Sequence, residues 1–133
     1  MSAPLVDYGQ ALRRFLLADA GLAALVGERI YANSDVPEAG YTPDVGGAIC
    51  FTLRGGRPEY VDVLLRASVQ FRCYAATEVE ADALYRALYA ALHNAQSAAV
   101  RWARCEVLGQ PLVEPETGWP MVLSVFTVWL ANG

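Results

Sequence analysis

Few side chains in this sequence are of the kinds that transfer protons or bind metals. His93 is the only histidine, so one chain can form neither a histidine-containing triad nor a multi-histidine metal site. Three cysteines stand far apart without a CxxC pair, which predicts neither a disulfide framework nor a zinc knuckle. The stretch RGGRPEY has two glycines but lacks the GK[ST] of a phosphate-binding loop. The sequence therefore predicts no catalytic residues, no cofactor-binding residues and no metal ligands.

Tyr85, Tyr89 and His93 follow one another at intervals of four residues within a predicted helix. Residues at this spacing lie on the same flank of a helix. A packed or partly exposed flank is the ordinary interpretation, and a role in proton transfer is the less favoured one.

All ten basic residues of the chain are arginines. A guanidinium group is planar and suited to paired contacts with carboxylates. Several arginines fall on a predicted hairpin or its tip, where solvated positions are the default interpretation. The alternative is that they make salt bridges between subunits, because charges fix how one subunit is oriented on another. On this alternative the candidate contact residues, with neighbouring polar and aromatic side chains, are Arg54, Arg57, Arg66, Gln70, Arg72, Tyr85, Tyr89 and Trp129.

Length and composition set broad limits. A chain of 133 residues predicts one domain, residues 1–133. Its hydrophobic content of 55% is high and its charged content of 18% is low, so either the core is rich or subunits bury apolar surface against each other. A net charge of −4 argues against a nucleic-acid grip, which needs a basic surface. Without a basic region before an apolar one, or an apolar run of about 20 residues, we expect an intracellular protein with no membrane partner.

Periodicity and turn residues predict the elements. The first helix has Leu5, Leu12 and Leu16 on its apolar side, and a short second helix is capped by Asp19 and ended by Gly27. Further along we expect a strand at 28–32, a loop at 33–47, and strands at 48–54 and 61–74 joined by a turn at 55–60. A helix at 77–94 begins with a Thr77–Glu80 capping box. It is followed by a strand at 101–109, a loop at 110–120 and a strand at 121–131.

Two of the predicted strands carry the argument about packing. In 61–74 the odd positions are apolar and the even ones are mostly polar, which predicts an odd face in the core and an even face that is either solvated or in contact with a partner. The strand at 121–131 is apolar on both faces, interrupted only by Ser124 and Thr127. Such a strand is normally covered on both sides. Because the helices are expected mostly on one side, this strand favours an oligomer.

The order of these pieces carries a resemblance to a known family. LRRFLLADAGLAALVGERIYANSDVP is followed by a glycine-rich loop, then by AICFTLRGG, ASVQFRCYAATEVEADALYRALYAAL and a final VFTVWL. Its most telling parts are AALVGERIY and the strand-to-helix transition VQFRCYAATEVEADALYRAL. From about residue 10 to 131, the chain resembles the tail-terminator (tail-completion) proteins of long-tailed phages and gene-transfer agents, the group that includes relatives of the lambda tail terminator.

The resemblance implies an α+β fold, with about five strands in a mixed or antiparallel sheet and two main helices plus one short helix mostly on one face. It implies a structural virion protein without enzymatic activity: a homohexameric ring that caps the head-proximal end of the tail tube, ends polymerisation and provides the surface for head-tail joining. The implied partners are the tail tube protein and the neck or connector proteins. The implied location is the tail–neck junction of a virion made and assembled in the host cytoplasm.

Double-stranded DNA would pass through the lumen without specific binding. Six chains would carry a formal charge of −24, and an acidic channel would not hold phosphates.

Two alternatives stay open at this point. One is another ring of the neck, such as a head-completion or connector protein. The other is a small-molecule-binding α/β dimer, with a pocket between the long loops near Tyr41, Tyr60 and Trp119.

Overall fold

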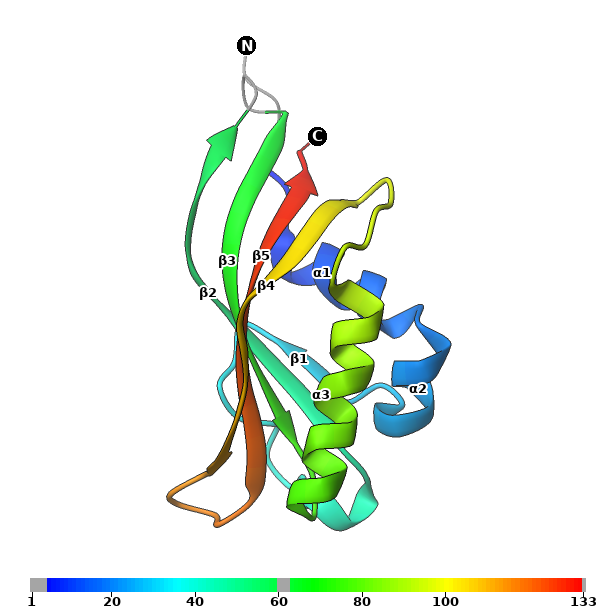
Figure 1. Cartoon of the computed structure of the whole chain (residues 1–133), viewed down its shortest axis with the longest axis vertical. Helices are drawn as coiled ribbons and strands as arrows, with labels where there is room; N and C mark the ends of the chain where they lie inside the picture. Colours follow the sequence, from blue (N-terminus) through cyan, green and yellow to red (C-terminus); the bar gives the residue numbers. More distant parts are fainter. Residues whose placement is uncertain (1–4, 60–62, 133) are drawn as a thin grey trace.

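The computed structural model describes residues 5–59 and 63–132 of the chain. Its elements follow the order α1 (Tyr8–Leu17), α2 (Ala20–Val26), β1 (Ile30–Ala32), a 3-10 turn at Pro43–Val45, β2 (Ala48–Glu59), β3 (Leu64–Tyr74), α3 (Glu78–Leu92), β4 (Val100–Val113) and β5 (Pro120–Ala131) (Figure 1).

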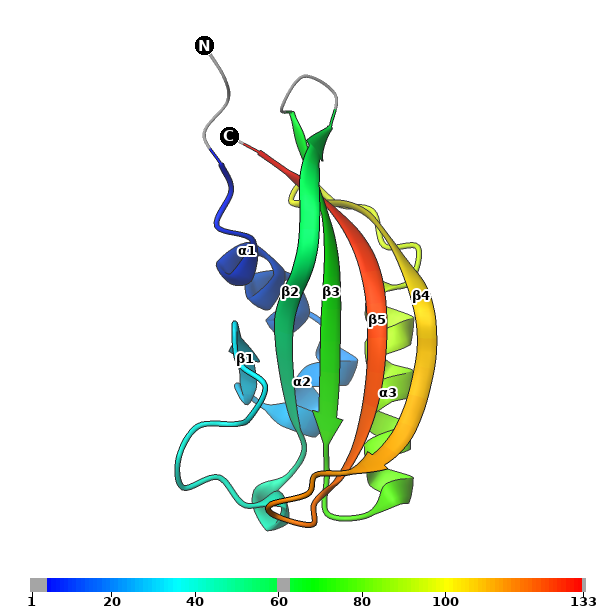
Figure 2. The same ribbon diagram turned by 90° about the vertical axis from the view of Figure 1, so that its left-hand side faces the viewer.

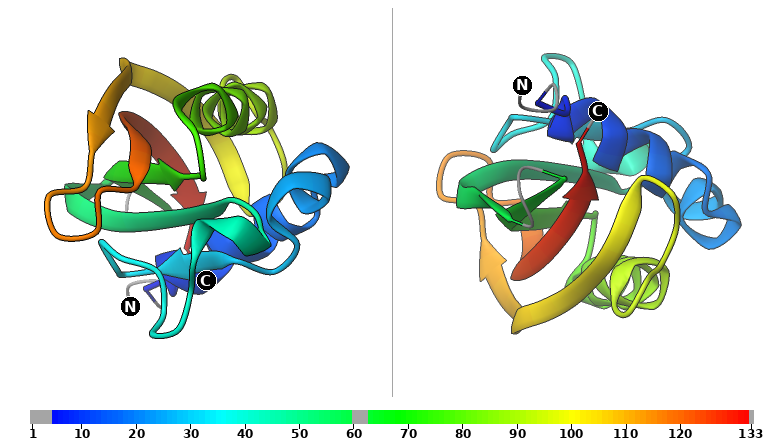
Figure 3. Two further views of the ribbon diagram at one scale, coloured as in Figure 1. Left: turned by 90° about the horizontal axis from the view of Figure 1, so that it is seen from below. Right: turned by 90° about the horizontal axis from the view of Figure 1, so that it is seen from above.

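In the described part of the chain, the strands form one open sheet in the order β1-β2-β3-β5-β4. β1 runs parallel to β2, and the other pairs are antiparallel. The α-helices of the described residues all lie behind this sheet in Figure 2, and they stand to one side of it when the molecule is seen along its long axis (Figure 3). The predicted fold class, an α+β domain with a mixed five-stranded sheet and helices mostly on one face, is confirmed.

The two N-terminal helices begin at aspartate caps. The Asp7 carboxylate accepts a hydrogen bond from the Gln10 amide at 3.1 Å, so α1 begins at Tyr8. Leu5 therefore lies before the helix and is 74% exposed, which makes its assignment to the apolar side wrong. Asp19 caps α2 and Gly27, with φ +58, ends it, as predicted.

β2 is longer than the sequence pattern predicts. A turn was expected at 55–60, but residues 55–59 continue the strand through a bulge between Leu53 and Gly55, where Gly55 adopts φ +142. Gly56 passes so close to β3 that a Cβ there would lie 2.2 Å from the Arg66 carbonyl oxygen. The two glycines thus permit a bulge and a close strand approach instead of a turn. β3 begins at Leu64, and the start of the strand predicted at 61 lies outside the described residues.

α3 follows its capping signal. The Thr77 hydroxyl oxygen accepts a hydrogen bond from the Glu80 amide at 3.1 Å, and Asp82 pairs with Arg86 at 2.9 Å. The helix ends at Leu92 rather than near Asn94, which adopts a positive φ of 61°. The predicted helix is confirmed, with its end two residues earlier.

β4 extends to Val113, so the residues 110–113 that were predicted as loop belong to the strand, and the connecting loop is 114–119. The pairing of β4 with β5 contains three register shifts. Each shift adds twist and bends the strand. β4 can therefore follow β5 over its full length despite Gly109 and Pro111.

The core lies between the sheet and the helices. The odd-numbered side chains of β3 point into it, as predicted, and Phe71 is 0% exposed. Val63, which the alternation assigned to the same face, lies just before the strand and is 54% exposed, so the prediction is wrong at that residue. Its ring contacts those of Phe51 and Phe126 at centroid distances of 5.5 and 5.4 Å. These contacts tie β2, β3 and β5 together beneath the helices.

A smaller cluster of Cys50, Tyr74 and Met121, with Trp119 packed against it, lies on the opposite face of the sheet. The loops 33–47 and 114–119 lie at the same end of the molecule as the C-terminal end of β3 (Figure 2). The Tyr74 hydroxyl donates to the Asp35 carbonyl oxygen at 2.8 Å. The even face of β3 is therefore covered at its C-terminal end and open further along.

The second face of β5 also differs from expectation. No described helix covers it, yet Met121, Val125 and Thr127 are buried by their surroundings within the chain. Surplus apolar surface instead lies on the edge strand β4, where Val107, Leu108, Leu112 and Val113 are exposed. The sequence pattern assigned the uncovered apolar surface to the wrong strand, because β5 occupies an interior position in the sheet.

Candidate interaction surface

The open face of the sheet carries two stacked tryptophans, each with an arginine against it. Arg66 of β3 lies opposite Trp129 of β5, which lies opposite Trp102 of β4. The indole rings stack at 4.7 Å with an interplanar angle of 23°. The guanidinium carbon of Arg66 is 5.7 Å from the Trp129 centroid, and that of Arg104 is 5.6 Å from the Trp102 centroid. We call Arg66, Trp129, Trp102 and Arg104 the arginine–tryptophan row.

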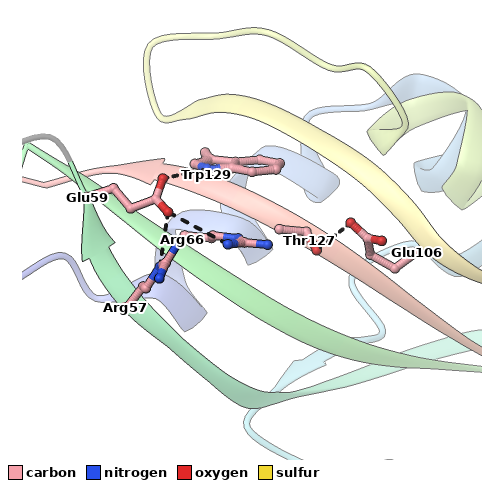
Figure 4. Close-up of polar contacts among 6 residues, drawn as sticks. All are labelled: Arg57, Glu59, Arg66, Glu106, Thr127 and Trp129. Atoms are coloured by element: carbon pink, nitrogen blue, oxygen red, sulfur yellow. Dashed lines mark hydrogen bonds and ion pairs between the residues drawn. The ribbon is translucent and has the colours of Figure 1, made fainter.

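Glu59 at the end of β2 joins this row to the neighbouring strand. One carboxylate oxygen accepts a hydrogen bond from the Trp129 indole N–H at 3.2 Å. The other oxygen lies 3.2 Å from the Arg57 Nε and 3.8 Å from an Arg66 Nη (Figure 4). Arg57 is 68% exposed, and solvated ion pairs contribute about 0–1 kcal/mol to stability. The contacts therefore orient the side chains more than they stabilise the fold.

Two shallow hollows flank the row. One, of about 520 Å³, is lined by Gly55, Gly56, Arg57, Arg66, Ser68, Glu106 and Thr127. Within it the Thr127 hydroxyl donates to a Glu106 carboxylate oxygen at 2.8 Å (Figure 4). The other, of about 510 Å³, lies beside the tryptophans and is lined by Glu59, Val63, Leu64, Arg101, Trp102 and Trp129. Both hollows are open to solvent and wide enough for protruding side chains of a partner protein.

The structure brings together some of the predicted contact residues. Arg57, Arg66 and Trp129 meet around Glu59, and Arg54 is exposed on the same strand as Arg57. Gln70 and Arg72 share the β3 face of Arg66 but lie further towards the loops and are half-buried. The Nε of Arg72 is buried and has no hydrogen-bond partner among the described residues.

Tyr85 and Tyr89 lie apart from this surface, on the side of α3 that packs on the core. Tyr89 stacks on His93 at 4.5 Å, and the His93 Nδ1 accepts a hydrogen bond from the Cys105 amide at 3.0 Å. Burial raises the pKa of Tyr85 to about 12, so its hydroxyl stays neutral at physiological pH. This flank of the helix is packed, as its ordinary interpretation predicted.

Sequence reasoning missed Trp102, Arg104, Glu106 and Glu59. The first three stand at alternate positions of one predicted strand, a spacing that places side chains on the same face. The alternate spacing therefore predicts that these three side chains share one face of the strand. The pairing of β5 between β3 and β4, which brings Trp129 beside Trp102, cannot be read from the alternation within single strands.

The loops at the other end form a small cavity. Tyr41 and Trp119 do come together, at a centroid distance of 5.4 Å, and with neighbouring loop residues they line about 260 Å³. The Tyr41 hydroxyl donates to the Gly46 carbonyl oxygen at 2.7 Å, and burial raises its pKa to about 12. Tyr60, the third residue predicted there, lies outside the described residues.

Other chemical features are modest. Within residues 5–59 and 63–132, no group of three or more histidine, cysteine or carboxylate side chains is placed to hold a metal ion. Burial raises the pKa of the Cys50 thiol to about 12, which keeps it protonated and weakly nucleophilic. No helix in the described part of the chain has the length and apolar character needed to cross a membrane.

Comparison with known proteins gives a likeness of fold. No protein-family model and no curated protein matches the sequence. Among solved structures, a chain from the virion of a native gene transfer agent particle superposes with a TM-score of 0.62 at 20% sequence identity, over 94% of this chain and 94% of that one. At this identity the match concerns the fold. The protein thus shares its fold, along nearly its whole length, with a chain of a gene transfer agent virion.

Proposed function

We propose that the protein is a structural component of a phage-like virion, the tail terminator. Six copies form a ring on the head-proximal end of the tail tube, end its polymerisation and present the surface for head-tail joining. The observation that carries this proposal is the fold likeness over 94% of the length to a gene transfer agent virion chain. It agrees with the independent resemblance of the sequence pieces to tail-terminator proteins.

The open sheet face supports a role in protein–protein association. Tryptophan and arginine are enriched among the residues that contribute most to binding at protein interfaces. The arginine–tryptophan row presents both on a rigid sheet, and β4 adds exposed apolar side chains at its edge. A ring needs such contacts because each subunit must bind a neighbour through one patch and be bound through another.

The net charge of the chain fits the same role. A formal charge of −4 for each chain gives an acidic ring, through which double-stranded DNA passes without specific binding. The protein then acts by contact with copies of itself, with the tail tube protein and with neck proteins, and not as an enzyme.

Charge reversal tests the surface. Arg54→Glu with Arg66→Glu should abolish ring formation, as measured by light scattering, and leave the monomer folded, as measured by circular dichroism. Arg14→Glu is the matched control, since Arg14 is exposed on α1, away from the open face. Intact rings from the double variant would show that these arginines are not at the interface.

Two other functions remain as alternatives. Another neck ring would share the assembly but bind the head connector instead of the tail tube, so binding to isolated tubes separates the two. A small-molecule-binding dimer finds support in the meeting of Tyr41 and Trp119. It is less favoured, because a cavity of 260 Å³ is below the roughly 300–1,000 Å³ of ordinary ligand sites.

A further inference from the structure

We propose that the arginine–tryptophan row of one subunit binds the first turn of α3, around Val79, on the next subunit of the ring. This inference rests on the proposed ring and names the two patches that meet in it. The row and the α3 turn belong to the same chain, so every copy carries both halves of the contact.

The row has an excess of positive charge. Arg66 and Arg104 belong to it, and Arg57 and Arg101 lie beside it, against the carboxylates of Glu59 and Glu106. Among the described residues, Arg101 and Arg104 make no ion pair within the chain. The surface therefore offers half-exposed aromatic rings and unpaired guanidinium groups together, which suits a partner that is both apolar and acidic.

The first turn of α3 has that character. Val79 is 79% exposed, although it is the second residue of a well-packed helix whose N-cap is Thr77. Glu78 and Glu80 on either side are exposed as well. The helix dipole explains why carboxylates are favourable there, but it gives no reason for an exposed valine. A hollow of about 550 Å³, reaching Pro111 of β4, lies beside it and gives the turn a shaped surface.

The two patches lie apart on the molecule, so one copy can offer both of them at once. The row lies on the open face of the sheet, and α3 lies on the opposite, helical face (Figures 1 and 2). A contact between them joins unlike patches and leaves one of each free on every pair of subunits. Repetition of such a contact closes into a ring when the rotation allows it.

In the contact we infer, Val79 packs against the half-exposed rings of Trp102 and Trp129. The carboxylates of Glu78 and Glu80 face the guanidinium groups of Arg66 and Arg104. The charges fix the orientation of one subunit on the other, and the apolar contact excludes water from their neighbourhood.

A charge-swap experiment tests this pairing. One variant carries Arg66→Glu and Arg104→Glu, and the other carries Glu78→Arg and Glu80→Arg. Each alone should self-associate roughly 100-fold more weakly than the unmodified protein, because like charges then face each other. An equimolar mixture should assemble again, with the two variants alternating, since each altered patch meets a complementary one. Native mass spectrometry and light scattering measure assembly and the ratio of the two variants.

Controls keep the test interpretable. Circular dichroism and thermal unfolding check that each variant is folded; if Arg66→Glu unfolds the chain beside Glu59, Arg101→Glu with Arg104→Glu takes its place. Arg14→Glu and Glu28→Arg, exposed positions outside both patches, must leave assembly intact. All proteins are measured alone and with purified tail tubes.

The outcomes separate this inference from the proposed function. Rings from either variant alone, or a mixture that stays monomeric while the unmodified protein assembles, overturn the pairing only. Loss of tube binding by the row variant with normal self-association would mean that the row binds the tube protein instead, and would also overturn it. An unmodified protein that remains a 14.4 kDa monomer with and without tubes overturns the ring itself.

Discussion

Phe71→Ala tests the assignment of the β3 faces and the position of the core. Phe71 is fully buried and contacts Phe51 and Phe126 at 5.5 and 5.4 Å. Truncation of a buried phenylalanine to alanine costs about 3–5 kcal/mol, through lost transfer energy and the cavity left behind. Domains of this size are stable by about 5–15 kcal/mol, so the variant should fold but be marginal.

Urea denaturation followed by circular dichroism measures the effect. With an m-value of about 1.5 kcal/mol/M, the midpoint should fall by roughly 2–3 M without a change in m. Phe71→Leu, which keeps most of the apolar volume, should cost only about 1–2 kcal/mol. Gln70→Ala, on the opposite face, should change stability by about 0.5 kcal/mol or less. A nearly neutral Phe71→Ala together with a costly Gln70→Ala would refute the face assignment.

Three further predictions follow from local contacts. Tyr41→Phe should cost about 1 kcal/mol at pH 7, through the lost hydrogen bond to Gly46. Burial raises the pKa of Tyr41 from 10 to about 12, so the free energy of unfolding of the unmodified protein should fall as the pH rises through that interval. The fall should be smaller in Tyr41→Phe when unfolding of both proteins is measured between pH 8 and 12. Gly56→Ala should destabilise by about 1–3 kcal/mol, since its Cβ would lie 2.2 Å from a backbone oxygen of β3, and an unchanged melting temperature would contradict that geometry. Thr77→Ala should cost about 0.5–2 kcal/mol by removing the α3 cap, with Thr77→Ser nearly neutral in the same melting assay.

Much of the fold could be predicted from local sequence signals. Asp19 and Thr77 begin their helices because their side chains satisfy amide groups that have no partner in the first turn. The alternation in β3 assigned Phe71 to the core because side chains on a strand alternate between its two faces. These signals act within a few residues, so no knowledge of the tertiary structure was needed.

The errors arose where tertiary contacts decide the outcome. Gly55 and Gly56 are typical of a turn, but across from β3 they form a bulge and a close approach. The edge strand β4 continues through Pro111 because its free edge does not require the missing N–H. The candidate surface was only partly predictable for the same reason: Arg66 and Trp129 were found as single residues, whereas their meeting with Trp102 and Glu59 depends on strand order.

Electron microscopy of tail tubes assembled with and without the protein tests the central claim most directly. The account predicts a six-fold ring at one end of each tube, with tubes that no longer elongate when more tube protein is added. Tubes that keep elongating and carry no ring, in the presence of folded protein in excess, would contradict it.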